Sequence, residues 1–489
     1  MKQKKNIVIL IAIFVLISLI ILPKSLGDLD ELWNYSFAKN IAEGRLPYRD
    51  FNMIQTPLLP LILGLILKLF ANELIVMRIL AIVLCTTVFF LVYKILEKSL
   101  NINTYVGLGI TVFLIYIFKD HVRIDYNFAV LLMVLILIYL ELGKKISVES
   151  SKKYDLLIGV IAGTSILFKQ TTGLAISAIT IGYKILEIEK KENIKKYLKI
   201  VLYRMIGVFI PLALFALYLI TYGIWSEFID YTILGVKTFS NSIPYTNLFE
   251  NDKIIIKILA VVLPIFLAVQ GILGAVTKQR EQANKYIVLF SYSVASAIVI
   301  FPITDEIHFL IGTLPCIIGM FYIIYNIINK FLKGNIKVFL KYFIQVASIL
   351  IFICFIVYQG LSLKNKDTFS SLNHYSYIPI SNGIETQIKE MIKYLNSNED
   401  VYILDSSSIV YKIPLDTYSK NYDMFLKGNL GSKGEGGIIE DLKNKEDIKV
   451  LIMKEKYSRN WQNPEEVRKY ITGNWNKTGE IQLFDIYEK

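Results

Sequence analysis

The stretch that decides the fold is KQKKNIVILIAIFVLISLIILPKSLGDLDE, residues 2–31. Lysines precede an uninterrupted apolar run, and three acids, Asp28, Asp30 and Glu31, follow it. An apolar run between charged flanks is typical of a membrane-crossing helix whose basic end lies in the cytoplasm. Because no small-x-small cleavage site follows the run, we expect the helix to be retained rather than removed as a signal peptide.

The rest of the chain repeats this apolar pattern. Of its 489 residues, 54% are hydrophobic and 19% are charged, and the mean hydropathy is +0.50. A soluble domain is roughly 45–50% apolar and about a quarter charged, so the composition excludes a disordered chain and most soluble enzymes. It predicts a polytopic α-helical membrane protein. The further apolar segments are 74–93, 104–118, 128–142, 155–168, 173–187, 200–222, 254–277, 286–301, 310–329 and 338–360.

The net charge of +12 indicates topology rather than a nucleic-acid partner. Residues 362–489 hold 18 Lys and Arg and 19 Asp and Glu, a net charge of −1, so residues 1–361 carry +13. The positive charge gathers in five loops that follow alternate spans, and the positive-inside rule places such loops in the cytoplasm. The result is about 11 transmembrane helices, a cytoplasmic N-terminus and an extracytoplasmic C-terminal tail. The five loops are 94–98, 144–153, 184–199, 278–285 and 330–341.

The sequence predicts two domains. Residues 1–361 form the transmembrane domain, whose first outer loop, residues 23–73, holds juxtamembrane helices such as the short apolar segment Thr56–Phe70. Residues 362–489 form a small extracytoplasmic α/β domain. In this tail we expect strands at 401–404, 450–453 and 481–484, helices at 382–396 and 464–473, and a loop at 431–437.

The first outer loop carries the most unusual charges. Asp28, Asp30 and Glu31 fall within four residues directly after a membrane helix. Each charge would cost about 2.5–3.5 kcal/mol inside the bilayer, so they belong at the interface. There they can bind a cation or act as a base. The alternative is a solvated acidic cap that ends the first helix.

Other polar residues fall on the same predicted face. The short loop 119–127 contains Asp120, Arg123 and Asp125. Lys169 interrupts the segment 155–187, which is either a helical hairpin or a re-entrant pair of helices. A lysine between apolar helices requires an anionic partner. His308 lies in the loop 301–309 beside acids. Carboxylates suit deprotonation or metal binding, and Arg and Lys suit a phosphate leaving group, although interfacial snorkelling is an equal alternative for the loops.

These pieces resemble the GT-C glycosyltransferases, above all the branch of protein O-mannosyltransferases and aminoarabinose transferases. The resemblance covers roughly residues 1–330. Its opening part is carried by Asp30-Glu31, Tyr35, Ala38, Ile41, Gly44, Pro47-Tyr48, Thr56-Pro57-Leu58, Phe70 and Arg78. Its later parts are Arg123-Ile124-Asp125, Phe168-Lys169-Gln170, and Pro302 through Asp305 to His308, followed by Pro315.

The resemblance implies an inverting hexosyl or pentosyl transfer at the extracytoplasmic face. The donor would be a polyprenyl-phosphate sugar, and the acceptor, a cell-envelope glycan, lipid or protein, stays unknown. Asp30 would be the base, with Glu31 in support. Asp28 and Asp30 also form a DxD motif, which leaves open which of the two aspartates is the base. Lys169 and Arg123 would bind the donor phosphate, while the acceptor or a cation would be positioned by Asp125, Asp120 and His308. A divalent cation is left open, and no other cofactor is expected.

Two other classes of function remain as alternatives. A transporter or lipid flippase also has many helices, but it predicts functional charges at mid-depth and internal repeats. A polysaccharide polymerase or ligase shares the lipid-linked donor but normally requires a large late outer loop. The charges here gather at one predicted face, which favours the transferase.

Overall fold

The computed structural model of the chain describes residues 2–143, 151–187, 194–238, 242–331, 334–362, 368–398, 400–425, 428–459 and 463–489. The fold divides into two compact units, each assembled from separate segments. The first unit comprises residues 1–21, 80–215 and 242–364. The second comprises residues 22–79, 216–241 and 365–489. The domain boundary at residues 361 and 362 stays a prediction from the sequence.

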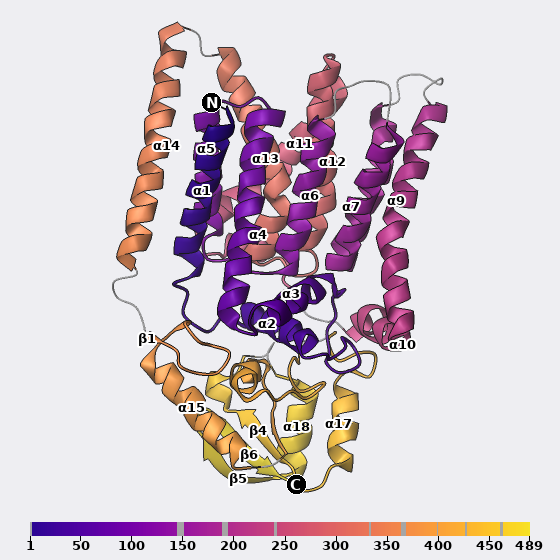
Figure 1. Cartoon of the computed structure of the whole chain (residues 1–489), viewed down its shortest axis with the longest axis vertical. Coiled ribbons are helices and arrows are strands. Elements are labelled where there is room, and N and C mark those ends of the chain that lie inside the picture. Colours follow the sequence, from indigo (N-terminus) through magenta and orange to yellow (C-terminus); the bar gives the residue numbers. More distant parts are fainter. Residues whose placement is uncertain are drawn as a thin grey trace. The chain divides into compact units, whose positions relative to one another are not determined.

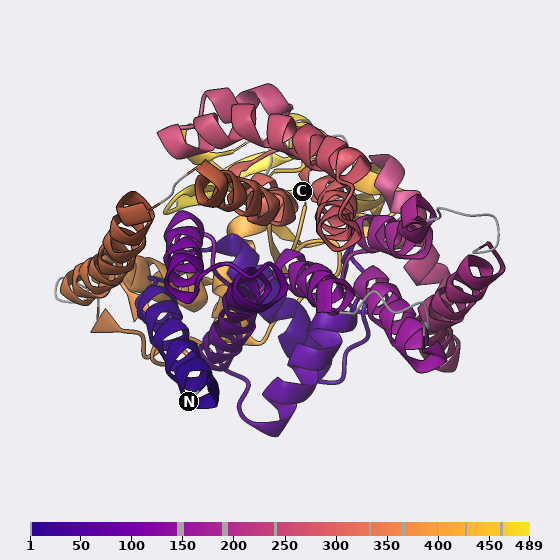
Figure 2. The same ribbon diagram turned by 90° about the horizontal axis from the view of Figure 1, so that it is seen from above.

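The first unit is a bundle of helices, which Figure 1 shows side by side and Figure 2 shows from above. Each of the eleven apolar segments found in the sequence coincides with a helix, as predicted. Among the described residues, seven helices are long and apolar enough to cross a membrane, namely α1, α4, α6, α9, α11, α12 and α13. The bounds are α1 (Lys2–Ile21), α4 (Leu74–Lys94), α5 (Thr104–Phe118), α6 (Tyr126–Gly143), α7 (Lys152–Phe168), α8 (Gln170–Gly182), α9 (Ile194–Thr221), α11 (Ile254–Val276), α12 (Arg280–Ala297), α13 (Glu306–Phe331) and α14 (Gly334–Ser362).

Short helical turns extend or connect these helices. Residues Ile95–Ser99 form a π-helix, η1, that continues α4. The 3₁₀ turns of this unit are η2 (Tyr183–Glu187), η6 (Tyr245–Phe249) and η7 (Ile298–Ile300).

Glycines let α7 and α9 approach closely. Gly159 and Gly163 on α7 have the small-xxx-small spacing that brings membrane helices together. A Cβ added at Gly159 would lie 2.2 Å from the Arg204 carbonyl oxygen, and one at Gly207 would lie 2.3 Å from the Leu156 carbonyl oxygen. The two backbones therefore touch along this seam.

A buried ion network also joins these helices, and the sequence analysis did not find it. The Arg204 guanidinium lies 2.6 Å from a carboxylate oxygen of Glu141 on α6 and 3.4 Å from one of Asp155 on α7. Lys184 lies 3.6 Å from Glu141. Arg204, Glu141 and Asp155 are all almost completely buried. Because charges cost free energy when they leave water, their mutual pairing is what makes this burial tolerable.

The second unit contains helices packed with a sheet. In its described part, β3 (Val401–Ile403), β4 (Lys449–Met453), β6 (Phe484–Glu488) and β5 (Asn476–Ile481) form one sheet in that order. β3 and β4 are parallel, and the other pairs are antiparallel. Buried apolar residues such as Val450, Ile452, Ile471 and Trp475 form its core.

The remaining elements of the second unit are helices and one short strand pair. The pair is β1 (Thr368–Phe369) with β2 (Pro379–Ile380). The helices are α2 (Leu29–Ala42), α3 (Leu58–Leu69), α10 (Trp225–Ile229), α15 (Asn382–Asn396), α16 (Ile409–Lys412), α17 (Gly434–Asn444) and α18 (Glu465–Asn474). The short turns are η4 (Asp230–Leu234), η5 (Gly235–Thr238), η9 (Ser406–Ser408), η10 (Ile413–Leu415) and η11 (Glu455–Tyr457).

Two predictions for the tail were wrong. The single strand predicted at 481–484 is the tight connection between β5 and β6, where Gln482 adopts a left-handed φ of 49° without the usual Asn or Gly. The loop predicted at 431–437 ends early, because α17 begins at Gly434. Three glycines in its first turn have low helix propensity, so the sequence pattern did not predict the helix there. Burial of Ile438 and Leu442 stabilises it.

Candidate active site

A group of polar side chains meets at one end of the first unit, and we call it the charged cluster. It is supplied by the loop between α5 and α6, the break between α7 and α8, the start of α11 and the start of α13. Four segments that are far apart in the sequence therefore contribute to one place. Its members are Asp120, His121, Arg123, Asp125, Asn127, Lys169, Asn251, Lys253, Asp305, Glu306 and His308.

Lys169 occupies the break between two helices. Its backbone is extended (φ −153°, ψ 110°), so α7 ends and α8 begins around it. Its ammonium group donates a hydrogen bond of 2.8 Å to the Asn127 side-chain oxygen and lies 5.3 Å from the centre of the Tyr126 ring. Burial disfavours its charged form, and the carboxylates of Asp125 and Asp305 offset part of that effect. The structure therefore places this lysine, which the sequence analysis expected to bind an anion, at the start of α6.

Asp125 and Arg123 form the next layer of the cluster. Asp125 accepts a 2.6 Å hydrogen bond from the Asn127 backbone, which orients the first turn of α6. The Arg123 guanidinium lies 3.6 Å from the other Asp125 oxygen. Both side chains are buried. Arg123 and Lys169 are thus two fixed cations that share one acidic neighbour.

The outer part of the cluster is a second set of ion pairs. Lys253 lies 2.7 Å from Asp120 and 2.6 Å from Glu306, and His121 lies 2.9 Å from Glu306. His308 contacts Asp305 at 2.7 Å. Burial raises the pKa of Asp305, but hydrogen bonds from His308 outweigh this effect and lower it overall. Asp305 therefore stays ionised near neutral pH.

The three acids of the first outer loop lie in the second unit and have different roles there. Asp28 caps α2, accepting hydrogen bonds from the backbone N–H groups of Asp30 (3.1 Å) and Glu31 (3.4 Å). Glu31 binds the Arg78 guanidinium through two hydrogen bonds of 2.9 Å each, and both side chains are buried. Asp30, on the same turn, is half-buried. Asp28 and Glu31 therefore orient the turn that carries Asp30.

The C-terminal region and α2 share a polar cluster that the sequence analysis missed. Lys39, completely buried, pairs with Glu43 and Asp416. His374 lies 2.7 Å from Asp416 and contacts Tyr35 at 3.2 Å. Burial raises the pKa of Asp416, but the hydrogen bond and charge of Lys39 and the charge of His374 outweigh it and lower the pKa.

The structure places some of the predicted residues in the first unit and the others in the second. Five lie in the charged cluster of the first unit, namely Asp120, Arg123, Asp125, Lys169 and His308. Asp28, Asp30 and Glu31 share one helical turn in the second. The sequence analysis did not identify Asn127 or Lys253, which carry no motif. It quoted Arg78 without assigning it a partner, and it included Glu306 only among the acids of the loop 301–309. In the described ranges, no group of three or more His, Cys, Asp or Glu side chains is arranged to hold a metal ion.

Comparison with known proteins identifies the fold. Residues 55–227 match the family of dolichyl-phosphate-mannose-protein mannosyltransferases, a segment that contains Asp120, Arg123, Asp125 and Lys169. The structure is similar to ArnT from Cupriavidus metallidurans bound to undecaprenyl phosphate, with a TM-score of 0.61 and 10% identity over 98% of this chain and 96% of that one. No curated protein sequence gives a match.

Two more solved structures have the same architecture. The apo form of the same ArnT gives a TM-score of 0.59 and 10% identity over 100% of this chain and 98% of that one. The Archaeoglobus fulgidus oligosaccharyltransferase in its apo form gives 0.51 and 12% identity over 92% of this chain and 69% of that one. The chain therefore has the fold that these solved structures share, as predicted, and with it the multi-pass membrane architecture.

Proposed function

We propose that this chain, a multi-pass membrane protein with the GT-C fold, transfers a sugar from a polyprenyl-phosphate-linked donor to an acceptor. The observation that carries the proposal is that Lys169 and Arg123 both interact with Asp125, inside the segment that matches the mannosyltransferase family. The similar ArnT was solved with undecaprenyl phosphate bound, which is the lipid part of such a donor. Fixed cations at a break between apolar helices suit the phosphate of a lipid carrier.

The chemistry of the leaving group explains why cations are required. Cleavage of the bond between the anomeric carbon and the phosphate oxygen leaves negative charge on the phosphate. Cations held in place stabilise this charge more in the transition state than in the ground state. The Lys169 ammonium has three N–H donors and Asn127 accepts a single hydrogen bond, so the contact to Asn127 orients the group and leaves donors for phosphate oxygens.

The acceptor side of the proposal rests on Asp30. We assign Asp30 as the base that takes the proton of the acceptor, because it lies on the helical turn that the Asp28 cap and the Glu31–Arg78 pair orient. A single displacement with this base inverts the anomeric carbon. The transferred sugar is a hexose or a pentose, and the acceptor belongs to the cell envelope. Asp120, Asp125 and His308 position the acceptor or a cation.

The orientation in the membrane is also part of the proposal. Five basic loops support a cytoplasmic N-terminus, which puts the charged cluster and the C-terminal region at the extracytoplasmic face. Nucleotide sugars are absent from that side, so a lipid-linked donor fits. The transporter and polymerase alternatives gain no support from the fold comparison.

A transfer assay with matched lysine variants tests the proposal. Purified full-length protein is incubated with membrane extract and polyprenyl-phosphate-linked hexose or pentose labelled in the sugar. We expect label to move to the acceptor fraction, and Lys169→Ala to lower kcat/KM by about 10²–10³, the usual loss on removing one transition-state contact. Lys119→Ala, on the loop that carries Arg123, removes the same charge and should keep wild-type activity. Equal activity in both variants, or no consumption of either donor, would contradict the proposal.

A further inference from the structure

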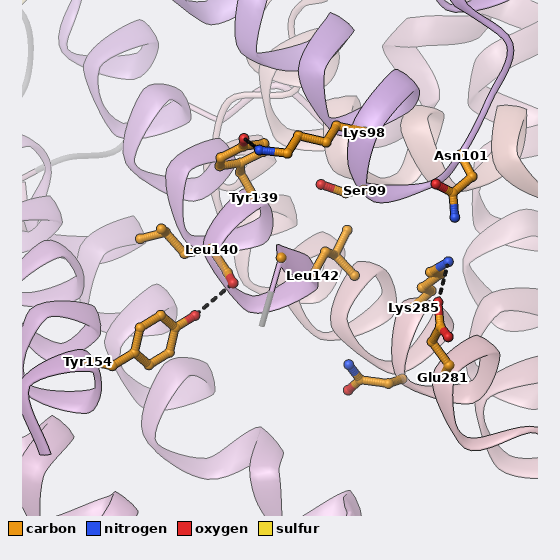
Figure 3. Close-up of a pocket in the computed structure, with 11 residues that line it drawn as sticks. Lys98, Ser99, Asn101, Tyr139, Leu140, Leu142, Tyr154, Glu281 and Lys285 are labelled. Carbon is orange, nitrogen blue, oxygen red and sulfur yellow. Dashed lines mark hydrogen bonds and ion pairs between the residues drawn. The ribbon is translucent and has the colours of Figure 1, made fainter. Parts of the chain in front are cut away.

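A second polar site lies in the first unit, away from the charged cluster. It is a cavity of about 630 Å³, lined by η1, the last turns of α6 and the first turns of α7 and α12 (Figure 3). The charged cluster surrounds the first residues of α6, whereas Tyr139 to Gly143 of the same helix line the cavity. At 1.5 Å per residue these ends are roughly 20 Å apart. The cavity therefore belongs to the end of the bundle where Lys98 and Lys285, each from one of the basic loops, lie.

Two lysines bring positive charge to opposite walls of the cavity (Figure 3). Lys98, on η1, is exposed and donates a 3.0 Å hydrogen bond to the Tyr139 hydroxyl. Lys285, on α12, is buried, and its ammonium group lies 3.2 Å from the exposed carboxylate of Glu281. With two cations and one carboxylate among its lining residues, the cavity carries a net positive charge, which suits an anion.

Polar groups in the same cavity call for a ligand that also donates a hydrogen bond. The Asn284 side-chain oxygen is buried and has no hydrogen-bond partner within the described part of the chain. A buried oxygen without a hydrogen bond costs free energy, so a ligand that donates a hydrogen bond to it would be stabilised there. Lys98 and Ser99 lie on the π-helix η1, and Asn101 adopts a left-handed φ of 58°. Single π-turns occur often at functional sites.

The inner wall of the cavity is apolar and firmly held. Leu140 and Leu142 line it, and the Leu140 carbonyl accepts a 2.7 Å hydrogen bond from the Tyr154 hydroxyl. Glu141 lies between these leucines in the chain and takes part in the buried ion network with Arg204. This wall of the cavity is therefore preformed, as in most small-molecule binding sites.

We infer that this cavity binds a phosphodiester headgroup that carries a hydroxyl or ammonium donor. The lysines bind the phosphate, Asn284 accepts the hydrogen bond of the headgroup, and the leucines contact the beginning of an apolar chain. A membrane lipid and a soluble glycerol phosphodiester share this chemistry. The site does not depend on the proposed sugar transfer, since it lies at the other end of α6.

Binding measured on the full-length protein in detergent tests the inference. The probes are phosphatidylglycerol, phosphatidylcholine, whose headgroup has no hydrogen-bond donor, and soluble glycerophosphoglycerol; native mass spectrometry gives the dissociation constants. We expect phosphatidylglycerol to bind at least tenfold more tightly than phosphatidylcholine. Lys98→Gln combined with Lys285→Gln should weaken it at least tenfold, while Lys195→Gln with Lys199→Gln, at the exposed start of α9, should leave it unchanged.

Two single variants keep the result interpretable. Lys98 is exposed, so Lys98→Gln alone retains the fold and should still weaken binding severalfold. Asn284→Leu should reduce the preference for phosphatidylglycerol over phosphatidylcholine without abolishing it, because the lysines still favour the anionic lipid over the zwitterionic one. Glycerophosphoglycerol binding as tightly as the lipid would assign the site to a soluble ligand. Equal losses in the cavity variants and the α9 control, or no preference between the two lipids, would overturn the inference.

Discussion

At the scale of single residues, substitutions at two neighbouring acids should have different effects. Loss of Glu31, the buried partner of Arg78, should lower stability, whereas loss of Asp30 should abolish catalysis. Glu31→Ala leaves the Arg78 charge buried without its partner, a change that typically costs 3–5 kcal/mol, about the effect expected here. Asp30→Asn, one residue away and half-buried, should leave stability nearly unchanged and abolish sugar transfer. Thermal unfolding in detergent and the transfer assay measure the two effects. A stable, inactive Glu31→Ala protein would instead make Glu31 the base.

A second residue-scale prediction concerns acid. Because the pKa of Asp416 is lowered in the folded protein, its carboxylate stabilises the fold above the unfolded pKa of about 3.9, and this contribution is lost as the pH falls towards the folded value. The melting temperature of Asp416→Asn should therefore lie below that of the wild type at pH 5, and the gap should narrow below pH 4. Asp447→Asn, another left-handed aspartate (φ 54°) that is exposed, is the control and should show no gap. A difference in melting temperature that widens on acidification would show that the pKa of Asp416 is not lowered by folding.

At the scale of helices and strands, the seam between α7 and α9 should tolerate no side chain. Gly207→Ala would place its Cβ 2.3 Å from the Leu156 carbonyl oxygen, so the backbones must separate at a cost of about 1–3 kcal/mol or more. Gly182→Ala at the end of α8 has open space around it and should be neutral or slightly stabilising. Circular dichroism during heating compares the two. Equal melting temperatures would show that α7 and α9 do not pack through these glycines.

The same scale shows what the sequence could predict. Apolar runs bounded by charges predicted the helices of the bundle that the structure describes, and Lys169 marked the break between α7 and α8, because burial in a membrane imposes strong local patterns. The sequence could not predict ion pairs between residues that are far apart along the chain. Lys253 is 133 residues from Asp120, and Arg204 meets Glu141 and Asp155 only because α6, α7 and α9 pack together. The strand error at 481–484 has a local cause, since Gln482 turns the chain without a turn residue.

At the scale of the whole molecule, the sequence analysis made one prediction on which all the functional assignments depend, the direction in which the bundle crosses the membrane. Its basis is physical: short lysine-rich loops resist translocation, whereas a long tail such as residues 362–489 translocates largely regardless of its charge. An odd number of crossings must then separate the N-terminus from the tail. Counting a single helix wrongly would reverse the side on which the tail lies.

Cysteine labelling decides this topology. In a background without Cys85, Cys316 and Cys354, a single cysteine replaces either Ser397 in the tail or Ser151 in a basic loop, both of which are exposed. A maleimide reagent that cannot cross membranes should label Ser397→Cys in spheroplasts, whereas Ser151→Cys should react only after permeabilisation. The melting temperature of each variant controls for misfolding. The opposite pattern would place the tail in the cytoplasm, where nucleotide sugars are available, and would remove the reason for a lipid-linked donor.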